Sequence, residues 1–123
     1  MTASQNQGGM QFKRIEEMPV WQDARRLTTL ICKFSQKNKF KTDYGLKDQI
    51  EGSSLSVMSN IAEGYERNSG KEFLVFLRYA NGSIGEVRNQ LYVASGLGYI
   101  DREEFQFTHD LCISAILQFC YLI

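Results

Sequence analysis

The chain has 123 residues, of which 43% are apolar and 23% charged, and its net charge is zero, which is the size and composition of one folded domain. No apolar run reaches the roughly 20 residues of a membrane-spanning helix, and residues 1–12 show neither the basic start nor the apolar stretch of a signal peptide. These features exclude a largely disordered chain, argue against membrane insertion and predict a cytoplasmic protein.

Charge is unevenly distributed along the chain. Residues 1–47 hold nine Lys/Arg against four Asp/Glu, a net charge of +5, and residues 48–123 hold five against ten, a net charge of −5. Such polarity suits nucleic acid or an acidic partner, although the solvated faces of ordinary helices are its commoner cause.

The three cysteines are odd in number, lack CxxC spacing and lie in apolar stretches: Cys32, Cys112 and Cys120. This pattern favours buried thiols over a disulfide or a metal site, and buried thiols fit a reducing compartment.

The first half of the chain predicts two helices. Residues 1–11 are polar and rich in glycine, which indicates a mobile tail before a helical domain at 12–123. Pro19 suits the first position of a helix over about 19–37, in which apolar residues recur every three or four positions: Val20, Ala24, Leu27, Ile31 and Phe34. Thr42 or Asp43 then caps a second helix over about 43–66, whose apolar side holds Leu46, Ile50, Val57, Ile61 and Tyr65.

The second half predicts two more helices. Ser69 and Glu72 have the spacing of a capping box and open a helix over about 70–97, which the glycines of GLGY end. Asp101 and Glu104 repeat the capping-box spacing before a fourth helix with an apolar stripe. No alternating strand pattern competes. We therefore predict an all-α, antiparallel up-down-up-down four-helix bundle.

The segment SNIAEG at 59–64 combines small and polar residues inside the second helix. The third helix offers small residues in return, and glycine in an exposed helix interior costs up to about 1 kcal/mol unless close helix packing offsets it. We expect Asn60 and Glu63 to hydrogen-bond across this contact. The predicted packing seam consists of Ser56, Asn60, Glu63, Gly64, Gly82 and Ser83.

A catalytic centre is the alternative interpretation of this segment. It would need a nucleophile, a base and an orienting group within reach of one another, and the sequence offers no such set. The only histidine, His109, lies near the apolar stripe of the fourth helix, where a hydrogen-bonded core histidine is favoured over a metal ligand. Gln106 replaces the Glu of the Glu-x-x-His motif of di-iron bundles. We expect no enzyme activity, no metal and no other cofactor.

The second and third helices carry apolar residues away from their core stripes. A helix that is apolar on several sides is buried on several sides, so we expect self-association, with a ring and a dimer both compatible with the periodicity. The candidate interface residues are Leu55, Met58, Val75, Tyr79, Val93 and Leu97.

Four motifs carry a resemblance that covers about Phe12 to Ile100: VWQDARRL, YGLKDQI, SNIAEGYERNSGKEFLVFLRYANGSIGEV and LGYI. In this order they resemble the bacterial four-helix-bundle family of 23S rRNA-intervening-sequence proteins and, more distantly, the accessory variability proteins of diversity-generating retroelements. The resemblance implies a homopentameric ring, no catalytic activity and a role in binding RNA or DNA, often alongside a reverse transcriptase.

The sequence departs from that family at two places. Glu51 and Gly52 stand where typical members have a basic pair, and Met58 stands where a proline is frequent. The first departure removes phosphate contacts and so weakens the case for nucleic-acid binding. Basic residues remain on the first helix and the connection after it: Arg25, Arg26, Lys33, Lys37, Lys39 and Lys41.

Two interpretations of function stay open. The first is an accessory protein that binds RNA or DNA through these six residues, which a ring would repeat into a positive belt. The second is an oligomeric scaffold that binds a protein client, such as a reverse transcriptase, without touching nucleic acid. A stacking platform for single strands is not expected, because core packing accounts for Trp21 and the phenylalanines.

Overall fold

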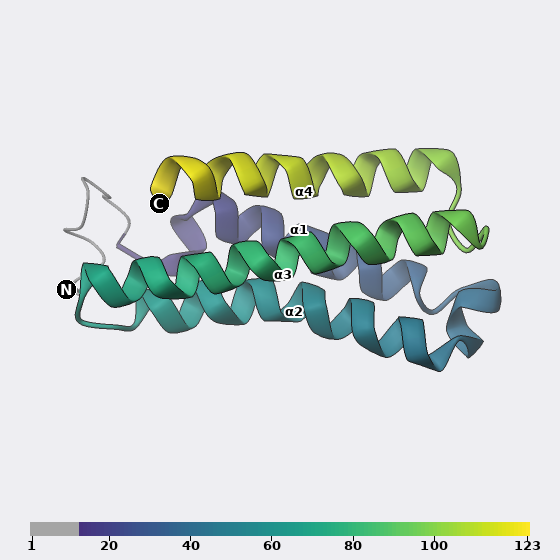
Figure 1. The fold of residues 1–123 in the computed structure, drawn as a ribbon, viewed down its shortest axis with the longest axis horizontal. Helices are drawn as coiled ribbons and strands as arrows, with labels where there is room; N and C mark the ends of the chain where they lie inside the picture. Colours follow the sequence, from purple (N-terminus) through teal and green to yellow (C-terminus); the bar gives the residue numbers. More distant parts are fainter. Residues whose placement is uncertain (1–12) are drawn as a thin grey trace.

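The computed structural model describes residues 13–123, which form four α-helices and two short 3-10 helices, without a strand in that range (Figure 1). The predicted all-α fold with four helices is confirmed. The predicted tail at 1–11 lies outside the described residues, as does Phe12. The elements in chain order are η2 (Ile15–Glu17), α1 (Pro19–Phe34), η3 (Asn38–Thr42), α2 (Tyr44–Tyr65), α3 (Gly70–Gly96) and α4 (Arg102–Leu122).

The helix ends follow the local signals in the sequence. Asp43, rather than Thr42, caps α2 by accepting a hydrogen bond from the amide of Leu46 at 3.2 Å. Asp101 and Glu104 form the full capping box of α4, with bonds of 2.7 and 2.8 Å. Gly98 follows α3 with a φ of +76°, the left-handed conformation that ends helices.

The connection after α1 differs from the prediction. The helix ends at Phe34, three residues before the expected end at 37, and η3 follows. Asn38 takes a φ of 52° at the start of η3, in the left-handed region that asparagine tolerates better than most residues. A local turn conformation therefore ends the periodic pattern early.

The main helix contacts join α1 to α2, α2 to α3, α3 to α4 and α4 to α1. Two contacts between each pair of consecutive helices show their relative direction, because the residue number increases on the first helix where it decreases on the second. From α1 to α2 these contacts are Thr28–Ser54 and Ser35–Glu51. From α2 to α3 they are Ser53–Gln90 and Ser56–Ser83, and from α3 to α4 they are Arg88–His109 and Tyr92–Phe105. This order is consistent with the predicted up-down-up-down arrangement.

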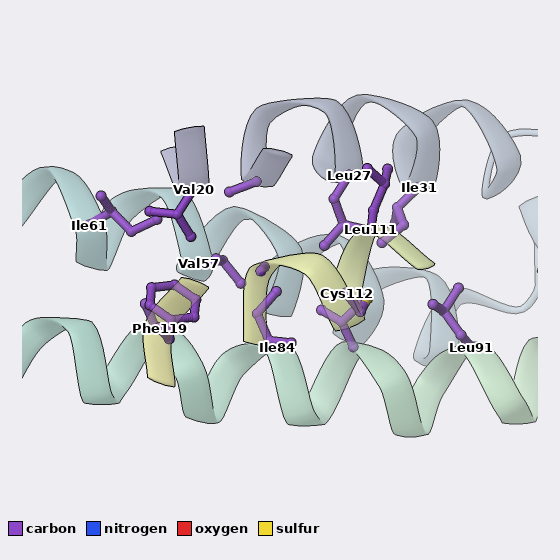
Figure 2. Packing of buried hydrophobic residues seen from close by; sticks show 14 of the residues in the cluster. Val20, Leu27, Ile31, Val57, Ile61, Ile84, Leu91, Leu111, Cys112 and Phe119 are labelled. Atoms are coloured by element: carbon purple, nitrogen blue, oxygen red, sulfur yellow. The ribbon is translucent and has the colours of Figure 1, made fainter. Parts of the chain in front are cut away.

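All four helices contribute to one hydrophobic core, part of which Figure 2 shows. Its largest fully buried side chains include Phe40, Phe73 and Phe119. Burial of each large apolar side chain contributes roughly 1.5–3 kcal/mol. Two buried hydroxyls fit this core because they donate to carbonyls of their own helix: Ser54 to Glu51 at 3.0 Å and Thr108 to Glu104 at 2.7 Å.

Part of the predicted seam lies where α2 meets α3. The hydroxyls of Ser56 and Ser83 share a hydrogen bond of 3.0 Å across the two helices. Gly64 is buried, and a Cβ added there would lie 2.8 Å from Cβ of Phe76 and 3.0 Å from Cδ1 of Phe73. Gly64 thus allows a helix approach that alanine would obstruct.

Three seam residues need correction. Asn60 is partly buried but donates to the carbonyl and hydroxyl of Ser56 on its own helix. Glu63 is exposed and pairs with Arg67 one turn later, at 2.8 Å, instead of bonding to α3. Gly82 is exposed, and within residues 13–123 no atom beyond its chain neighbours and its own helix backbone lies within 4 Å of an added Cβ. Position on a helical wheel does not reveal which flank of the stripe meets the neighbouring helix.

Candidate nucleic-acid interface

We call the six cationic residues of α1 and the connection after it the basic face: Arg25, Arg26, Lys33, Lys37, Lys39 and Lys41. All six are exposed. The opposite side of α1 is buried in the core, so the core contacts orient the basic face toward solvent. Arg26 and Lys33 are seven residues apart, about two turns of α1, which places them along one line of this side, whereas Lys37 lies beyond the end of the helix at Phe34.

Lys39 and Lys41 flank an anchored residue of η3. Phe40 between them is buried and stacks on Tyr99, with ring centroids 5.1 Å apart. Because Phe40 fixes this turn to the connection between α3 and α4, its two lysines are held at one end of the bundle.

The charges of the basic face are not neutralised by ion pairs within residues 13–123. The ion pairs found in that range are Arg14–Glu17, Lys47–Glu51 and Arg67–Glu63. The carboxylate of Asp23, also on α1, faces α4, where Ser114 and Gln118 donate to its Oδ2 at 3.0 and 2.7 Å. The basic face therefore presents a local excess of positive charge.

Part of the basic face lines a depression of about 500 Å³, which we call the Trp21 depression. The structure brings three of the six cations together here and leaves the other three outside. The eight lining residues are Glu16, Trp21, Gln22, Arg25, Arg26, Thr29, Leu30 and Lys33.

Trp21 has a second role that sequence reasoning missed. It packs against the core, as expected, but it is only partly buried and its side chain also lines the depression. The guanidinium carbon of Arg25 lies 6.0 Å from the centroid of the indole ring, at the outer limit of a cation–π contact. The sequence feature that indicates this exposure is the position of Trp21 at the border between the apolar stripe and the cations of α1.

Glu51 does not oppose the basic face. Its carboxylate accepts a hydrogen bond from the hydroxyl of the buried Ser35, the C-cap residue of α1, and lies 3.1 Å from Nζ of Lys47. The glutamate thus compensates Lys47 and bonds to α1, so its effect on phosphate binding is smaller than its charge alone indicates. Burial, followed by the charge of Glu51, raises the pKa of the nearby Cys32 thiol.

His109 lies on α4, and its side chain contacts Arg88 on α3. Its Nε2 accepts a hydrogen bond of 3.3 Å from Arg88, and its ring stacks on Phe105 with centroids 5.2 Å apart. Burial and then the charge of Arg88 lower the pKa of His109. The predicted hydrogen bond is therefore present, but His109 is only partly buried and does not belong to the core, so the predicted core position is wrong. Among residues 13–123, no three His, Cys, Asp or Glu side chains are grouped closely enough to hold a metal ion.

The prediction of buried thiols is correct for one cysteine only. Cys112 is buried, and burial raises its pKa to about 12. Cys32 is partly buried, and Cys120 is exposed near the end of α4. Cys120 was wrongly predicted to be buried because the apolar residues around it are themselves divided between the core and the surface.

No helix within residues 13–123 has the length and apolar character needed to cross a bilayer.

The candidate interface residues do not form one patch. Tyr79 and Val93 on α3 and Leu97 directly after it are exposed, at 57%, 44% and 55%, whereas Val75 and Met58 are partly buried. Leu55 is exposed, but it lines a separate depression beside residues of α1. By helical spacing, the exposed Gly82 lies on the same side of α3 as Tyr79 and Val93.

Helix α4 has exposed apolar residues that the sequence analysis did not single out. Leu117 is 64% exposed and Tyr121 is 91% exposed, and both line a groove of about 350 Å³ beside the start of α1. Phe107 is 56% exposed, so core packing does not account for every phenylalanine. These residues were missed because a single apolar stripe was assigned to this helix.

A sequence model for the 23S rRNA-intervening sequence protein family matches residues 16–118. The match begins in η2, includes α1, α2 and α3, and ends within α4, so it contains the whole basic face. A search among curated proteins found no match.

Proposed function

Because the chain belongs to the family of 23S rRNA-intervening sequence proteins, we propose that it is a non-catalytic accessory protein that binds RNA or DNA through the basic face. The family name indicates a role related to nucleic acid. The free thiols of this chain suit a reducing compartment, and we propose that the protein is cytoplasmic.

The observation that carries this proposal is the excess of positive charge on the basic face. All six cations are exposed, and the carboxylate on the same helix, Asp23, is occupied by α4. Cations that are already in water lose little hydration when a phosphate replaces a counterion. Each phosphate contact contributes about 0.7–0.9 to the slope of log K against log salt concentration.

The test is a titration of structured RNA and duplex DNA into the full chain between about 50 and 200 mM salt. The variant Arg26→Glu/Lys33→Glu/Lys37→Glu is expected to weaken binding strongly and to reduce the salt slope by about 2–3. Absence of binding to either probe at the lowest salt would contradict the proposal.

A matched control has the same change in net charge at three other exposed cations: Lys71→Glu/Arg78→Glu/Arg102→Glu. These residues lie on α3 and α4. The control is expected to bind more tightly than the basic-face variant. Equal weakening in the two variants would mean that total charge, rather than the basic face, determines binding.

We also propose that the protein self-associates through the exposed side of α3. Tyr79, Val93 and Leu97 would be removed from water, and Gly82 would let a second backbone approach closely. The five-fold ring implied by the family resemblance would repeat the basic face around one axis. Val93→Glu/Leu97→Glu is expected to give a monomer in analytical ultracentrifugation, whereas an unchanged sedimentation coefficient would argue against this interface.

The second candidate function is an oligomeric scaffold that binds a protein client, such as a reverse transcriptase, without direct contact with nucleic acid. The apolar groove beside Leu117 and Tyr121 favours it, because such surfaces mark protein contacts. A client that copurifies after nuclease treatment, and equally with the basic-face variant, would support the scaffold over the nucleic-acid binder.

A further inference from the structure

We infer that the Trp21 depression binds an unpaired nucleotide, with its base stacked on the indole of Trp21 and the neighbouring phosphates held by Arg26 and Lys33. The inference rests on the proposed function and deepens it, because it names single-stranded RNA or DNA as the ligand class of the basic face.

The arrangement of α1 matches the repeat of a nucleotide strand. Gln22, Arg26, Thr29 and Lys33 follow one another at spacings of four, three and four residues, which forms one line along the outer side of the helix. Seven residues of helix separate Arg26 from Lys33, a rise of about 10 Å. This distance corresponds to about three nucleotides at the rise of roughly 3.4 Å per stacked base.

Trp21 supplies the apolar surface that such a strand requires. The indole lines the depression beside the cations, while its contact with the core fixes its position. Arg25, at 6.0 Å from the ring centroid, does not make close contact with the ring. An incoming base therefore displaces only a weak interaction, and Arg25 is then available to a phosphate.

The indole of Trp21 together with the cations favours the binding of single strands over duplexes. A duplex keeps its bases stacked inside and presents mainly phosphate to a surface of this kind, so Trp21 would contribute little to duplex binding. An unpaired base can leave the strand and occupy a depression of about 500 Å³, which is within the range of about 300–1,000 Å³ for ligand pockets.

Glu16 is the one acidic residue among those that line the depression. The side chain of Gln22 donates to the backbone carbonyl of Glu16 at 2.8 Å, which holds η2 beside α1. A carboxylate at this position repels phosphate. Glu16→Gln is therefore expected to tighten single-strand binding by about 2-fold to 5-fold, within the range of one exposed charge interaction.

The experiment uses the intrinsic fluorescence of Trp21, the only tryptophan of the chain. Oligouridylate and oligodeoxythymidylate of about 12 nucleotides, a blunt duplex of the same length and polyglutamate are titrated into the full chain at low salt. We expect both single strands, or one of them, to quench the emission and to bind about 10-fold more tightly than the duplex. Comparison of the two strands distinguishes RNA from DNA.

Substitutions separate stacking from charge. Trp21→Leu keeps an apolar side chain without a π system and is expected to weaken single-strand binding about 10-fold, measured by the anisotropy of a labelled oligonucleotide. Trp21→Phe is expected to restore part of this loss. Circular dichroism shows whether each variant is folded, and quenching of the unmodified chain tests the site even where a variant does not fold.

The remaining outcomes distinguish the two hypotheses. Salt-dependent binding of single strands without quenching, and without loss in Trp21→Leu, would overturn the nucleotide site but leave the proposed function intact. Equal quenching and affinity with the duplex or with polyglutamate would also overturn the site, because charge alone would then explain the effect. No binding of any nucleic acid would overturn the proposed function itself.

Discussion

Tyr99 donates its hydroxyl hydrogen to Oδ2 of Asp43 at 2.9 Å, which joins the connection between α3 and α4 to the residue that caps α2. The other carboxylate oxygen of Asp43 accepts the amide of Leu46. One aspartate therefore serves both as a helix cap and as a contact between two distant segments. The stacking of Tyr99 on Phe40 extends this contact to η3, which carries two lysines of the basic face.

The first prediction is that Asp43→Ala lowers the free energy of unfolding by about 1–2 kcal/mol, because the cap of α2 is lost. Tyr99→Phe is expected to cost less, since the cap remains in place. Urea unfolding of both variants and of the double variant gives the coupling between the two side chains. Additive effects would show that the bond between Tyr99 and Asp43 contributes nothing to stability.

The second prediction concerns Glu51, whose carboxylate joins α2 to Ser35 at the end of α1. Glu51→Lys is expected to lower the free energy of unfolding by about 1–3 kcal/mol, because the buried hydroxyl of Ser35 loses a charged acceptor and Lys47 gains a like charge beside it. Asp48→Lys is the matched control, since it makes the same charge change at an exposed neighbouring position. Equal stability of the two variants in urea would contradict this role for Glu51.

The third prediction compares two glycines. Gly64→Ala is expected to destabilise the protein by about 1–3 kcal/mol, because the new methyl group would overlap Phe76 and Phe73. Gly82→Ala meets open space and is expected to stabilise a monomer by about 0.5–1 kcal/mol through helix propensity. Thermal unfolding measures both effects, and a destabilising effect at Gly82 that depends on protein concentration would instead support the contact between copies.

These two glycines also show what could be predicted from the sequence. Helix number, caps and core stripes follow from local periodicity and short-range hydrogen bonding, so they were predictable. Whether a small residue beside a stripe faces a neighbour depends on the relative rotation and crossing of two helices. That information is not local, so Gly64 and Gly82 received the same assignment although one is buried and the other exposed.

The candidate site shows the same division between local and non-local information. Arg26, Lys33 and Lys37 were predicted to share a side away from the apolar stripe of the first helix; Arg26 and Lys33 lie exposed on α1, whereas Lys37 is exposed beyond the end of that helix. The depression depends on how η2 lies beside α1, through the bond from Gln22 to Glu16 six residues earlier, and helical periodicity does not predict that bond. Likewise, Glu63 has a partner on its own helix, and this local pairing prevailed over the expected bond to α3.

The fourth prediction is a loss of stability in mild acid that depends on His109. Burial and the charge of Arg88 lower the pKa of His109 in the folded state, so the unfolded chain binds a proton at higher pH than the folded one. Stability is therefore complete above the unfolded pKa of about 6.5 and falls as the pH drops through that value toward the lower folded pKa. The bond that Arg88 donates to Nε2 requires this nitrogen to be unprotonated, which gives the same direction of pH dependence.

The measurement for this prediction is the urea midpoint of the full chain and of His109→Gln between about pH 7.5 and pH 5.5. The difference between the two proteins is expected to narrow as the pH falls, and a difference that stays constant would show that His109 does not carry the acid sensitivity.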